Sequence, residues 1–192
     1  MIAIIKYNAG NIKSVENAVH RLGFSCRITD DREEILQAEK IIFPGVGEAG
    51  SAMNYLKEKN LDQLIKRLTQ PVLGICLGLQ LMCKSSEESN TTGLGIFDAK
   101  VKIFPPDDIV PHMGWNNFVS INSNLFNGID PQDDFYYVHS YYAEQCKHTI
   151  ATCNYIIPFS AAMQKDNFYA TQFHPEKSSG NGEIVLNNFL KL

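Results

Sequence analysis

Cys76 is the residue whose neighbours best fit it for nucleophilic chemistry. It is the centre of Gly74-Ile75-Cys76-Leu77-Gly78, which follows an apolar run typical of a strand and opens a stretch typical of a helix. Small residues two positions either side of the nucleophile characterise the strand-turn-helix elbow, here with sulfur in place of oxygen. The positive end of the helix favours a thiolate, and the N–H of Leu77 would point toward a developing oxyanion. A lone cysteine is more often a buried structural thiol, but the glycines and their context favour the catalytic interpretation.

A thiolate needs an acid–base partner, and the segment Phe173-His174-Pro175-Glu176 offers one. It follows an apolar run, proline fixes the turn after the histidine, and the carboxylate of Glu176 comes within reach of the imidazole. The order Cys, His, Glu is one that triad geometry permits. His139, on another apolar run, could equally be a core histidine with satisfied hydrogen bonds.

The third candidate element is Pro44-Gly45-Val46-Gly47, directly after an apolar run. Glycines let the backbone take unusual angles and present N–H groups to a ligand. Open α/β sheets bind ligands at the carboxyl ends of their strands, which favours a binding role over an ordinary loop.

The other four of the five cysteines are expected to be packing residues. Cys83 shares the helix face that follows the elbow, and Cys26 alternates with polar residues within a strand. Cys146, His148 and Cys153 could suggest a metal cluster, but their spacing fits no strong zinc pattern, so we expect no metal and no cofactor. An odd count without a CxxC pair argues against a secreted disulfide framework.

Strands and helices alternate through the first hundred residues. The strands are predicted at residues 2–5, 24–28, 41–43 and 72–75. The helices are predicted at residues 14–22, 31–38, 49–68 (with a possible break near Asn60) and 77–84. Because each strand is apolar throughout, the pattern predicts a parallel sheet covered by helices on both faces.

The second half is richer in short strands joined by polar turns. They are predicted at residues 99–104, 117–121, 135–143, 150–155, 160–164 and 169–173. Residues 85–93 are expected to form a loop, and residues 183–190 a closing helix. The predicted fold class is therefore α/β, a mostly parallel sheet flanked by helices with an antiparallel β-rich extension, in one domain over residues 1–192.

Composition narrows the class of protein. The chain of 192 residues has a net charge of −4 and no basic run, which argues against a nucleic-acid partner. No apolar stretch approaches the ~18 residues of a membrane span, and the amino terminus lacks the features of a signal peptide. We therefore expect a globular, cytoplasmic protein with no membrane partner.

Three motifs in register resemble those of a class I, triad-type glutamine amidotransferase domain. They are PGVG at 44–47, GICLGLQ at 74–80 and QFHPE at 172–176. More narrowly, the chain resembles the glutaminase subunits of imidazole glycerol phosphate synthases. The segments that carry this narrower resemblance are Tyr7…Gly10-Asn11…Ser14-Val15, PHMGWN at 111–116, YVHSY at 137–141 and HPEKS at 174–178.

The resemblance implies hydrolysis of glutamine to glutamate and ammonia. Cys76 would attack the side-chain amide carbon, His174 would carry the proton to the departing ammonia, and Glu176 would hold the imidazole. N–H groups of the glycine strip 45–47 and of Leu77 would stabilise the oxyanion, each donor typically by ~3 kcal/mol. The residues expected to face the glutamine are Gln80, Ser140 and Tyr141.

The resemblance also implies a partner, since ammonia released into water would be protonated and lost. We expect no room for an acceptor domain in this chain. The family solution is a heterodimer with a (β/α)₈-barrel cyclase that receives ammonia through its core. The cyclase forms imidazole glycerol phosphate and aminoimidazole carboxamide ribotide in histidine biosynthesis. The residues expected at the interface are Asn11, Met113, Trp115 and Lys177.

The first loop leaves an alternative open. The usual family pattern Asp-Tyr-Gly-x-Gly-Asn is replaced here by KYNAGN at residues 6–11. The triad is unaffected, but the identity of the partner is open, because paralogous glutaminase subunits feed ammonia to a synthetase that amidates cell-surface sugars. A non-catalytic interaction module and a thiol peptidase or γ-glutamyl hydrolase fit the intact triad and Gln80 less well.

Overall fold

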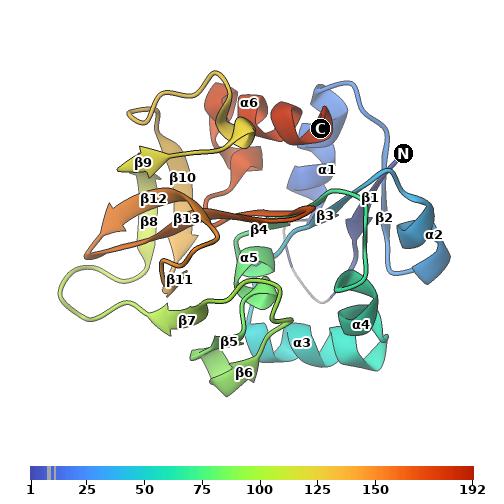
Figure 1. Cartoon of the computed structure of the whole chain (residues 1–192), viewed down its shortest axis with the longest axis horizontal. Coiled ribbons are helices and arrows are strands. Elements are labelled where there is room, and N and C mark those ends of the chain that lie inside the picture. Colours follow the sequence, from blue (N-terminus) through green and yellow to red (C-terminus); the bar gives the residue numbers. More distant parts are fainter. Residues whose placement is uncertain (8–9, 11) are drawn as a thin grey trace.

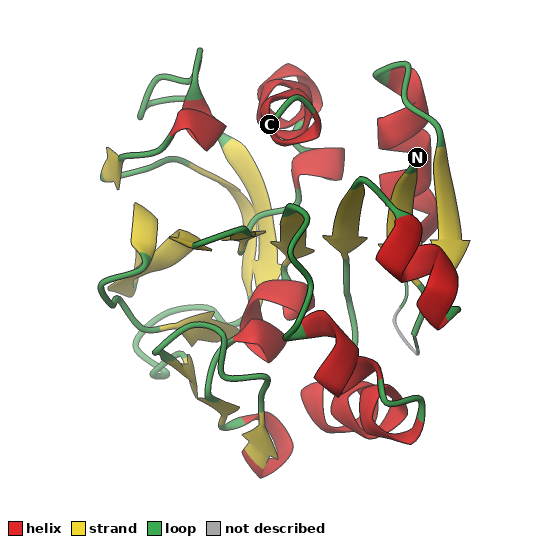
Figure 2. Ribbon diagram, turned by 45° about the vertical axis from the view of Figure 1, so that its right-hand side comes forward, coloured by secondary structure: helices red, strands yellow, loops and turns green. Residues whose placement is uncertain are grey.

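A computed structural model of the chain describes residues 1–7, 10 and 12–192. Asn8, one of the departures in the first loop, and Asn11, expected at a partner interface, lie outside the described residues. The described elements form a central sheet with helices on both of its faces and smaller sheets beside it (Figures 1 and 2).

The central sheet has eight strands in the order β2-β1-β3-β4-β14-β13-β12-β9. Neighbours from β2 to β14 run parallel, and β13, β12 and β9 continue the sheet in antiparallel fashion. The predicted mostly parallel sheet with an antiparallel extension is therefore confirmed. The strands are β1 (Ile2–Ile5), β2 (Cys26–Thr29), β3 (Lys40–Phe43), β4 (Val72–Ile75), β9 (Ser120–Ile121), β12 (Thr149–Tyr155), β13 (Ile157–Lys165) and β14 (Phe168–Thr171).

Helices cover the two faces of this sheet (Figure 1). Because strand side chains alternate between faces, Ala3 and Ile5 pack with α2, α3, α4 and α5, whereas Ile2 and Ile4 pack with α1 and α6. This double burial explains why β1 is apolar at every position. The helices are α1 (Ile12–Arg21), α2 (Arg32–Gln37), α3 (Ala49–Glu58), α4 (Leu61–Ile65), α5 (Leu77–Met82) and α6 (Ser179–Leu190).

Two smaller sheets lie on the left of Figure 1. One pairs β8 with β10 in antiparallel fashion, and the other has the order β11-β7-β5-β6. Their strands are β5 (Ser85–Ser86), β6 (Thr91–Thr92), β7 (Lys100–Ile103), β8 (His112–Asn116), β10 (Phe135–His139) and β11 (Tyr141–Ala143). The 3₁₀ turns are η1 (Glu88–Asn90), η2 (Asn124–Phe126) and η3 (Pro175–Lys177).

The extension differs from the sequence prediction in three places. Strand β8 was not predicted, because Gly114 and Asn116 mask its alternation. The run predicted at 135–143 breaks at Ser140, so that β10 and β11 belong to different sheets. Residues 85–93, predicted to form a loop, contain β5, η1 and β6. The partners of β8, β11 and β5 include strands that are distant in sequence, which local pattern does not reveal.

The possible break near Asn60 in the helix predicted at 49–68 is confirmed, since Asn60 has φ 55° and separates α3 from α4. Two other predictions need correction. The last helix starts at Ser179, four residues earlier than predicted. Cys26 is half-buried and not part of the core proper, because β2 is the edge strand of the sheet.

A search of the described part of the chain for a helix long and apolar enough to cross a lipid bilayer finds none.

Candidate active site

Cys76 occupies a sharp turn between β4 and α5, with φ 52° and ψ −105°. Such angles are costly for a residue with a side chain, and the surrounding structure must enforce them. The Cys76 N–H donates to the Thr171 carbonyl at 2.7 Å. A Cβ at Gly78 would lie 2.0 Å from the Phe43 carbonyl oxygen, and one at Gly74 would lie 3.0 Å from the Gly78 backbone. The predicted elbow is present, and both flanking glycines are required by close packing.

His174 and Glu176 form a buried pair beside the elbow. Nδ1 of His174 lies 2.9 Å from Oε1 of Glu176, and both side chains are 1% exposed. The other ring nitrogen, Nε2, is buried with no hydrogen bond to a nitrogen or oxygen of the described residues, and the ring interacts electrostatically with Cys76. The backbone is fixed by a bond from the His174 N–H to the Tyr136 carbonyl at 2.9 Å. The structure thus brings together the three residues of the predicted triad.

The imidazole of His174 lies between two groups that favour its protonation. Burial alone would lower the pKa of His174, but a Cys76 thiolate on one side and the Glu176 carboxylate on the other raise this pKa to about 10. At neutral pH the arrangement therefore favours a protonated His174, which places an acid beside the cysteine nucleophile.

The Cys76 side chain opens into a pocket of about 480 Å³, a volume suited to a small molecule. Gln80 is buried beside it, and its Nε2 donates to the Tyr141 carbonyl at 2.9 Å. Gly45 is buried and is not among the lining residues. The other residues predicted to bind glutamine or the oxyanion, and the predicted interface lysine, line the pocket: Val46, Gly47, Leu77, Gln80, Ser140, Tyr141 and Lys177.

The glycine strip already uses one of the predicted oxyanion donors. The Leu77 N–H donates to the Gly45 carbonyl at 3.3 Å. The neighbouring Pro44 carbonyl accepts a hydrogen bond from the Tyr7 hydroxyl. In this conformation the Leu77 N–H is not available to a substrate, and the Gly45 carbonyl must turn away before two N–H groups can converge on an oxyanion. The motif PGVG predicts the strip but not the direction in which its carbonyl points.

Gln172 is a site residue that the sequence reasoning missed. It is fully buried, and its Nε2 lies 3.6 Å from the Cys76 sulfur while its Oε1 accepts from Gln80 Nε2 at 3.1 Å. Its position two residues before His174 was the available signal, because residues two apart at a strand end share a face.

Glu88 is the second missed residue. It lies in η1 and lines the pocket, and its Oε2 accepts the Ala49 N–H at 2.9 Å. Burial raises its pKa, and the charge of Glu48 adds to that effect. No sequence signal could have identified it, because the segment SSEESN is polar throughout and its folding depends on pairing with β7.

An exposed patch borders the pocket, and we call Met113, Trp115, Tyr136 and Lys177 the mouth patch. Met113 is 62% exposed and Trp115 53% exposed. The Trp115 and Tyr136 rings lie 5.9 Å apart between centroids, and Lys177 Nζ lies 5.9 Å from the Tyr136 centroid. The strands β8 and β10 place Met113 opposite Val138, which lines the pocket. Three predicted interface residues therefore share one surface next to Cys76.

A hydrogen-bonded histidine pair extends from the pocket wall, where His139 lies, to the neighbouring strand β8. His139 Nδ1 lies 2.7 Å from the Tyr141 carbonyl, His139 Nε2 lies 3.0 Å from His112 Nδ1, and His112 Nε2 lies 3.3 Å from Asn116 Nδ2. Burial lowers the pKa of His139 to about 3 and that of His112 to about 4. His139 is thus a neutral core histidine with satisfied hydrogen bonds, one of the two interpretations that the sequence left open.

We expect this pair to make the protein less stable in mild acid. Both folded-state pKa values lie below the unfolded value of about 6.5, so unfolding takes up protons as the pH falls below that value. A net uptake of one proton over about 1.5 pH units corresponds to roughly 2 kcal/mol lost between pH 6.5 and 5. We take one proton as the mean uptake, because the unfolded histidines are only half protonated at pH 6.5 and the two rings interact in the folded state.

Urea unfolding at several pH values measures this effect. The variant His112→Gln should lose about half of the slope of unfolding free energy against pH between 5 and 6.5. Equal slopes in wild type and His112→Gln would contradict the assignment of neutral imidazoles.

Comparisons with known proteins agree with this geometry. Residues 3–192 match the sequence profile of the family described as glutamine amidotransferase class-I. The chain is 58% identical to the imidazole glycerol phosphate synthase subunit HisH of Bacteroides thetaiotaomicron, covering 100% of the chain and 99% of that protein. The HisH protein from Haemophilus influenzae is 46% identical, covering 99% and 96%.

Solved structures support the fold. A putative GMP synthase protein from Thermoplasma acidophilum superposes with a TM-score of 0.75 at 19% identity, covering 100% of the chain and 92% of that protein. The glutaminase domain of Trypanosoma brucei CTPS superposes with a TM-score of 0.65 at 17% identity, covering 99% and 93%.

Proposed function

The chain belongs to the glutamine amidotransferase class-I family, and from this premise we propose that it is the glutaminase subunit of imidazole glycerol phosphate synthase in histidine biosynthesis. The observation that carries the proposal is the arrangement of Cys76, His174 and Glu176 at a pocket of about 480 Å³. The 58% identity to a HisH protein over the whole chain supports the specific pathway.

The first half of the proposed reaction forms a thioester. The Cys76 thiolate attacks the side-chain amide carbon of glutamine, and the negative charge moves to the carbonyl oxygen. His174, protonated on Nε2, gives its proton to the departing ammonia as the C–N bond breaks. Glu176 accepts the Nδ1–H and holds the ring toward the sulfur.

The second half hydrolyses the thioester. Neutral His174 removes a proton from water, the hydroxide adds to the thioester carbon, and the C–S bond breaks to give glutamate and the Cys76 thiolate. Both halves pass through an oxyanion. We infer that the glycine strip turns its Gly45 carbonyl away from Leu77 to complete the oxyanion hole, so the enzyme works slowly until that happens.

We assign Glu88 to recognition of the substrate's α-ammonium group. Its side chain lines the pocket but is not part of the triad. It can therefore bind a positive charge of the substrate without taking part in the chemistry. The variant Glu88→Gln should raise KM for glutamine by about 10- to 100-fold with little change in kcat, because the lost contact is equal in ground and transition states.

Two controls sharpen this prediction. The neighbouring exposed variant Glu87→Gln should keep its KM. A glutamine analogue that lacks the α-amino group should be hydrolysed equally poorly by wild type and by Glu88→Gln. A loss that persists with this analogue would show that Glu88 acts on the fold of the pocket and not on the ammonium group.

The mouth patch is the surface that we assign to the partner, a (β/α)₈-barrel cyclase that takes up the released ammonia. Exposed Trp115 and Met113 are the kinds of side chain that anchor interfaces, and they lie next to the pocket where ammonia is produced. A cyclase docked there would cover Cys76 and keep ammonia from water.

Truncating Trp115 tests the docking surface. The variant Trp115→Ala should weaken binding to the cyclase by about 30-fold or more, since a central interface aromatic typically contributes at least 2 kcal/mol. Leu36→Ala removes a similarly exposed apolar side chain from α2 and should leave the affinity unchanged. Titration calorimetry with the purified cyclase measures both, and equal affinities would exclude Trp115 from the interface.

Complementation tests the proposed function as a whole. The gene should restore growth without histidine to a bacterial strain that lacks the glutaminase of this pathway, and Cys76→Ala should not. Failure of a well-expressed, folded protein to rescue growth would favour the paralogous role, delivery of ammonia to a synthetase that amidates cell-surface sugars.

A further inference from the structure

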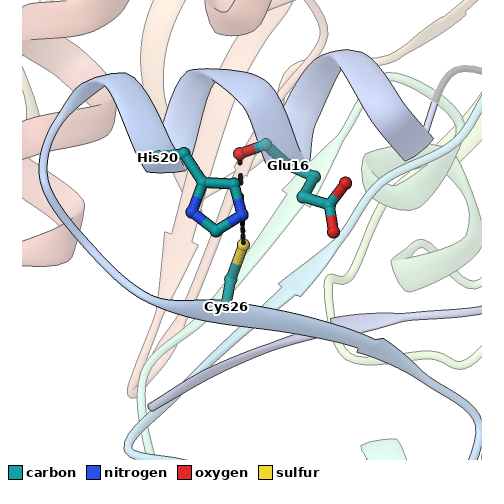
Figure 3. Close-up of side chains that lie close together, drawn as sticks. All are labelled: Glu16, His20 and Cys26. Carbon is teal, nitrogen blue, oxygen red and sulfur yellow. Dashed lines mark hydrogen bonds between the residues drawn. The ribbon is translucent and has the colours of Figure 1, made fainter.

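A glutamate, a histidine and a cysteine meet between α1 and β2, away from the triad (Figure 3). Glu16 and His20 are one helical turn apart on α1, and Cys26 is the first residue of β2. A carboxylate oxygen, an imidazole nitrogen and the thiol sulfur all lie within 4.8 Å of one another. We propose that these three side chains bind a thiophilic divalent cation, for which zinc is the best match.

The distances suit zinc. In a tetrahedral site with Zn–S of about 2.3 Å and Zn–N of about 2.0–2.1 Å, sulfur and nitrogen are separated by roughly 3.5 Å. Here Cys26 Sγ lies 3.8 Å from His20 Nε2. The spacing of four residues places Glu16 on the same helix face as His20, and rotation of its side chain toward the other two would complete three ligands. Water would supply the fourth, as in open zinc sites.

The orientation of His20 is the second, independent observation. Its Nδ1 lies 3.1 Å from the Phe24 carbonyl and can only donate there, so the hydrogen is on Nδ1. Nε2 is the ring nitrogen that faces the Cys26 sulfur (Figure 3), and in the neutral ring it carries the lone pair that a metal ion would take. A ring whose second nitrogen donates to a backbone carbonyl is the usual arrangement of a metal-binding histidine.

Metal binding must displace the proton of the Cys26 thiol and compete with Lys13 for the Glu16 carboxylate. Burial and the Glu16 carboxylate raise the pKa of Cys26, so the thiol is protonated before binding. Binding replaces the S–H bond by a Zn–S bond and releases one proton to the solvent. Lys13, which pairs with Glu16, competes with the cation for the carboxylate.

The site is remote from glutamine hydrolysis. Cys26 begins β2, whereas Cys76 follows the end of β4, and the strands between them are parallel. The two cysteines therefore lie at opposite ends of the parallel strands. A metal here would fasten the edge strand β2 to α1, which is a stabilising role. The expectation of no metal rested on Cys146, His148 and Cys153, and the packing role expected for Cys26 concealed this cluster.

Zinc titration of the full chain tests the proposal. The Cys76→Ser background removes the catalytic thiol as a competing ligand, and a chromophoric chelator reports free zinc. We expect one zinc and one released proton per chain. Adding Cys26→Ser should weaken binding by at least 30-fold, and adding Lys13→Met should tighten it several-fold. Adding Cys146→Ser, a half-buried thiol elsewhere, should change nothing.

Two further readouts keep the test decisive. Cobalt should give a sulfur-to-metal charge-transfer band that disappears with Cys26→Ser. Saturating zinc should raise Tm by about 5 °C, and this shift should be absent from Cys26→Ser, whose Tm without metal shows whether it folds normally. Equal zinc affinity with and without Cys26, or no sulfur band with cobalt, would overturn the proposal.

Discussion

Replacing Cys76 by serine is expected to lower the rate of glutamine hydrolysis by about 10⁴-fold or more. The expected loss is large because the site is arranged around a thiolate. A serine in the same backbone conformation, with φ 52°, would place a hydroxyl at the same point. That hydroxyl keeps its proton at neutral pH and is a far weaker nucleophile than a thiolate. Glutamate release in the presence of the proposed cyclase partner measures the effect, because we expect the hydrogen bond from Leu77 to the Gly45 carbonyl to slow the isolated chain.

The pKa of His174 is a second measurement, which distinguishes loss of the nucleophile from a general disturbance of the site. The Cys76 thiolate is one of the groups that raise the pKa of His174 to about 10 against the opposing effect of burial. Without that charge the pKa of His174 should fall, and NMR titration of the imidazole would record the change. Cys26→Ser makes the same chemical change at the other end of the parallel strands and should retain full activity. More than a tenth of wild-type activity in both Cys76→Ser and Cys76→Ala would show that another group is the nucleophile.

The parts of the site that local sequence could predict are those built by adjacent residues. The elbow depends on Gly74 and Gly78, whose hydrogens fill space where a Cβ would collide with backbone. The pair of His174 and Glu176 depends on a spacing of two residues around a proline. The strands β1, β3 and β4 could be predicted in the same way, since burial on both faces of the sheet demands apolar side chains at their buried positions.

The features of the site that the sequence did not predict depend mainly on contacts between residues distant in sequence. Glu88 reaches the pocket only because β5 pairs with β7, and polar residues 85–92 carry no periodic signal of that pairing. The alternation of residues predicted which face of its strand Cys26 lies on, but it could not show that β2 is the edge strand of the sheet. The hydrogen bond from Leu77 to the Gly45 carbonyl is set by the rotation of one peptide plane, which glycines permit in several orientations.

Glu176→Gln is expected to be the second most damaging substitution, with kcat reduced by about 10³- to 10⁴-fold. The amide keeps the size of the carboxylate and its burial, but it carries no charge and can donate as well as accept. It therefore neither stabilises the imidazolium nor fixes the hydrogen on Nδ1 of His174, 2.9 Å away. Replacing exposed Glu183 on α6 by Gln removes only a surface ion pair with Arg21 and should leave kcat unchanged.

The pH dependence distinguishes this mechanism from simple loss of packing. Because the folded-state pKa of His174 is raised to about 10, the imidazolium is present below that pH and is lost as the pH rises through it. Glutaminase activity of the wild type should therefore decline on an alkaline limb near pH 10. Glu176 is one of the groups that raise this pKa, so in Glu176→Gln the residual activity should decline at a distinctly lower pH. An alkaline limb at the same pH in both proteins, alongside a large fall in kcat, would mean that Glu176 supports the shape of the site but does not govern the charge of its acid.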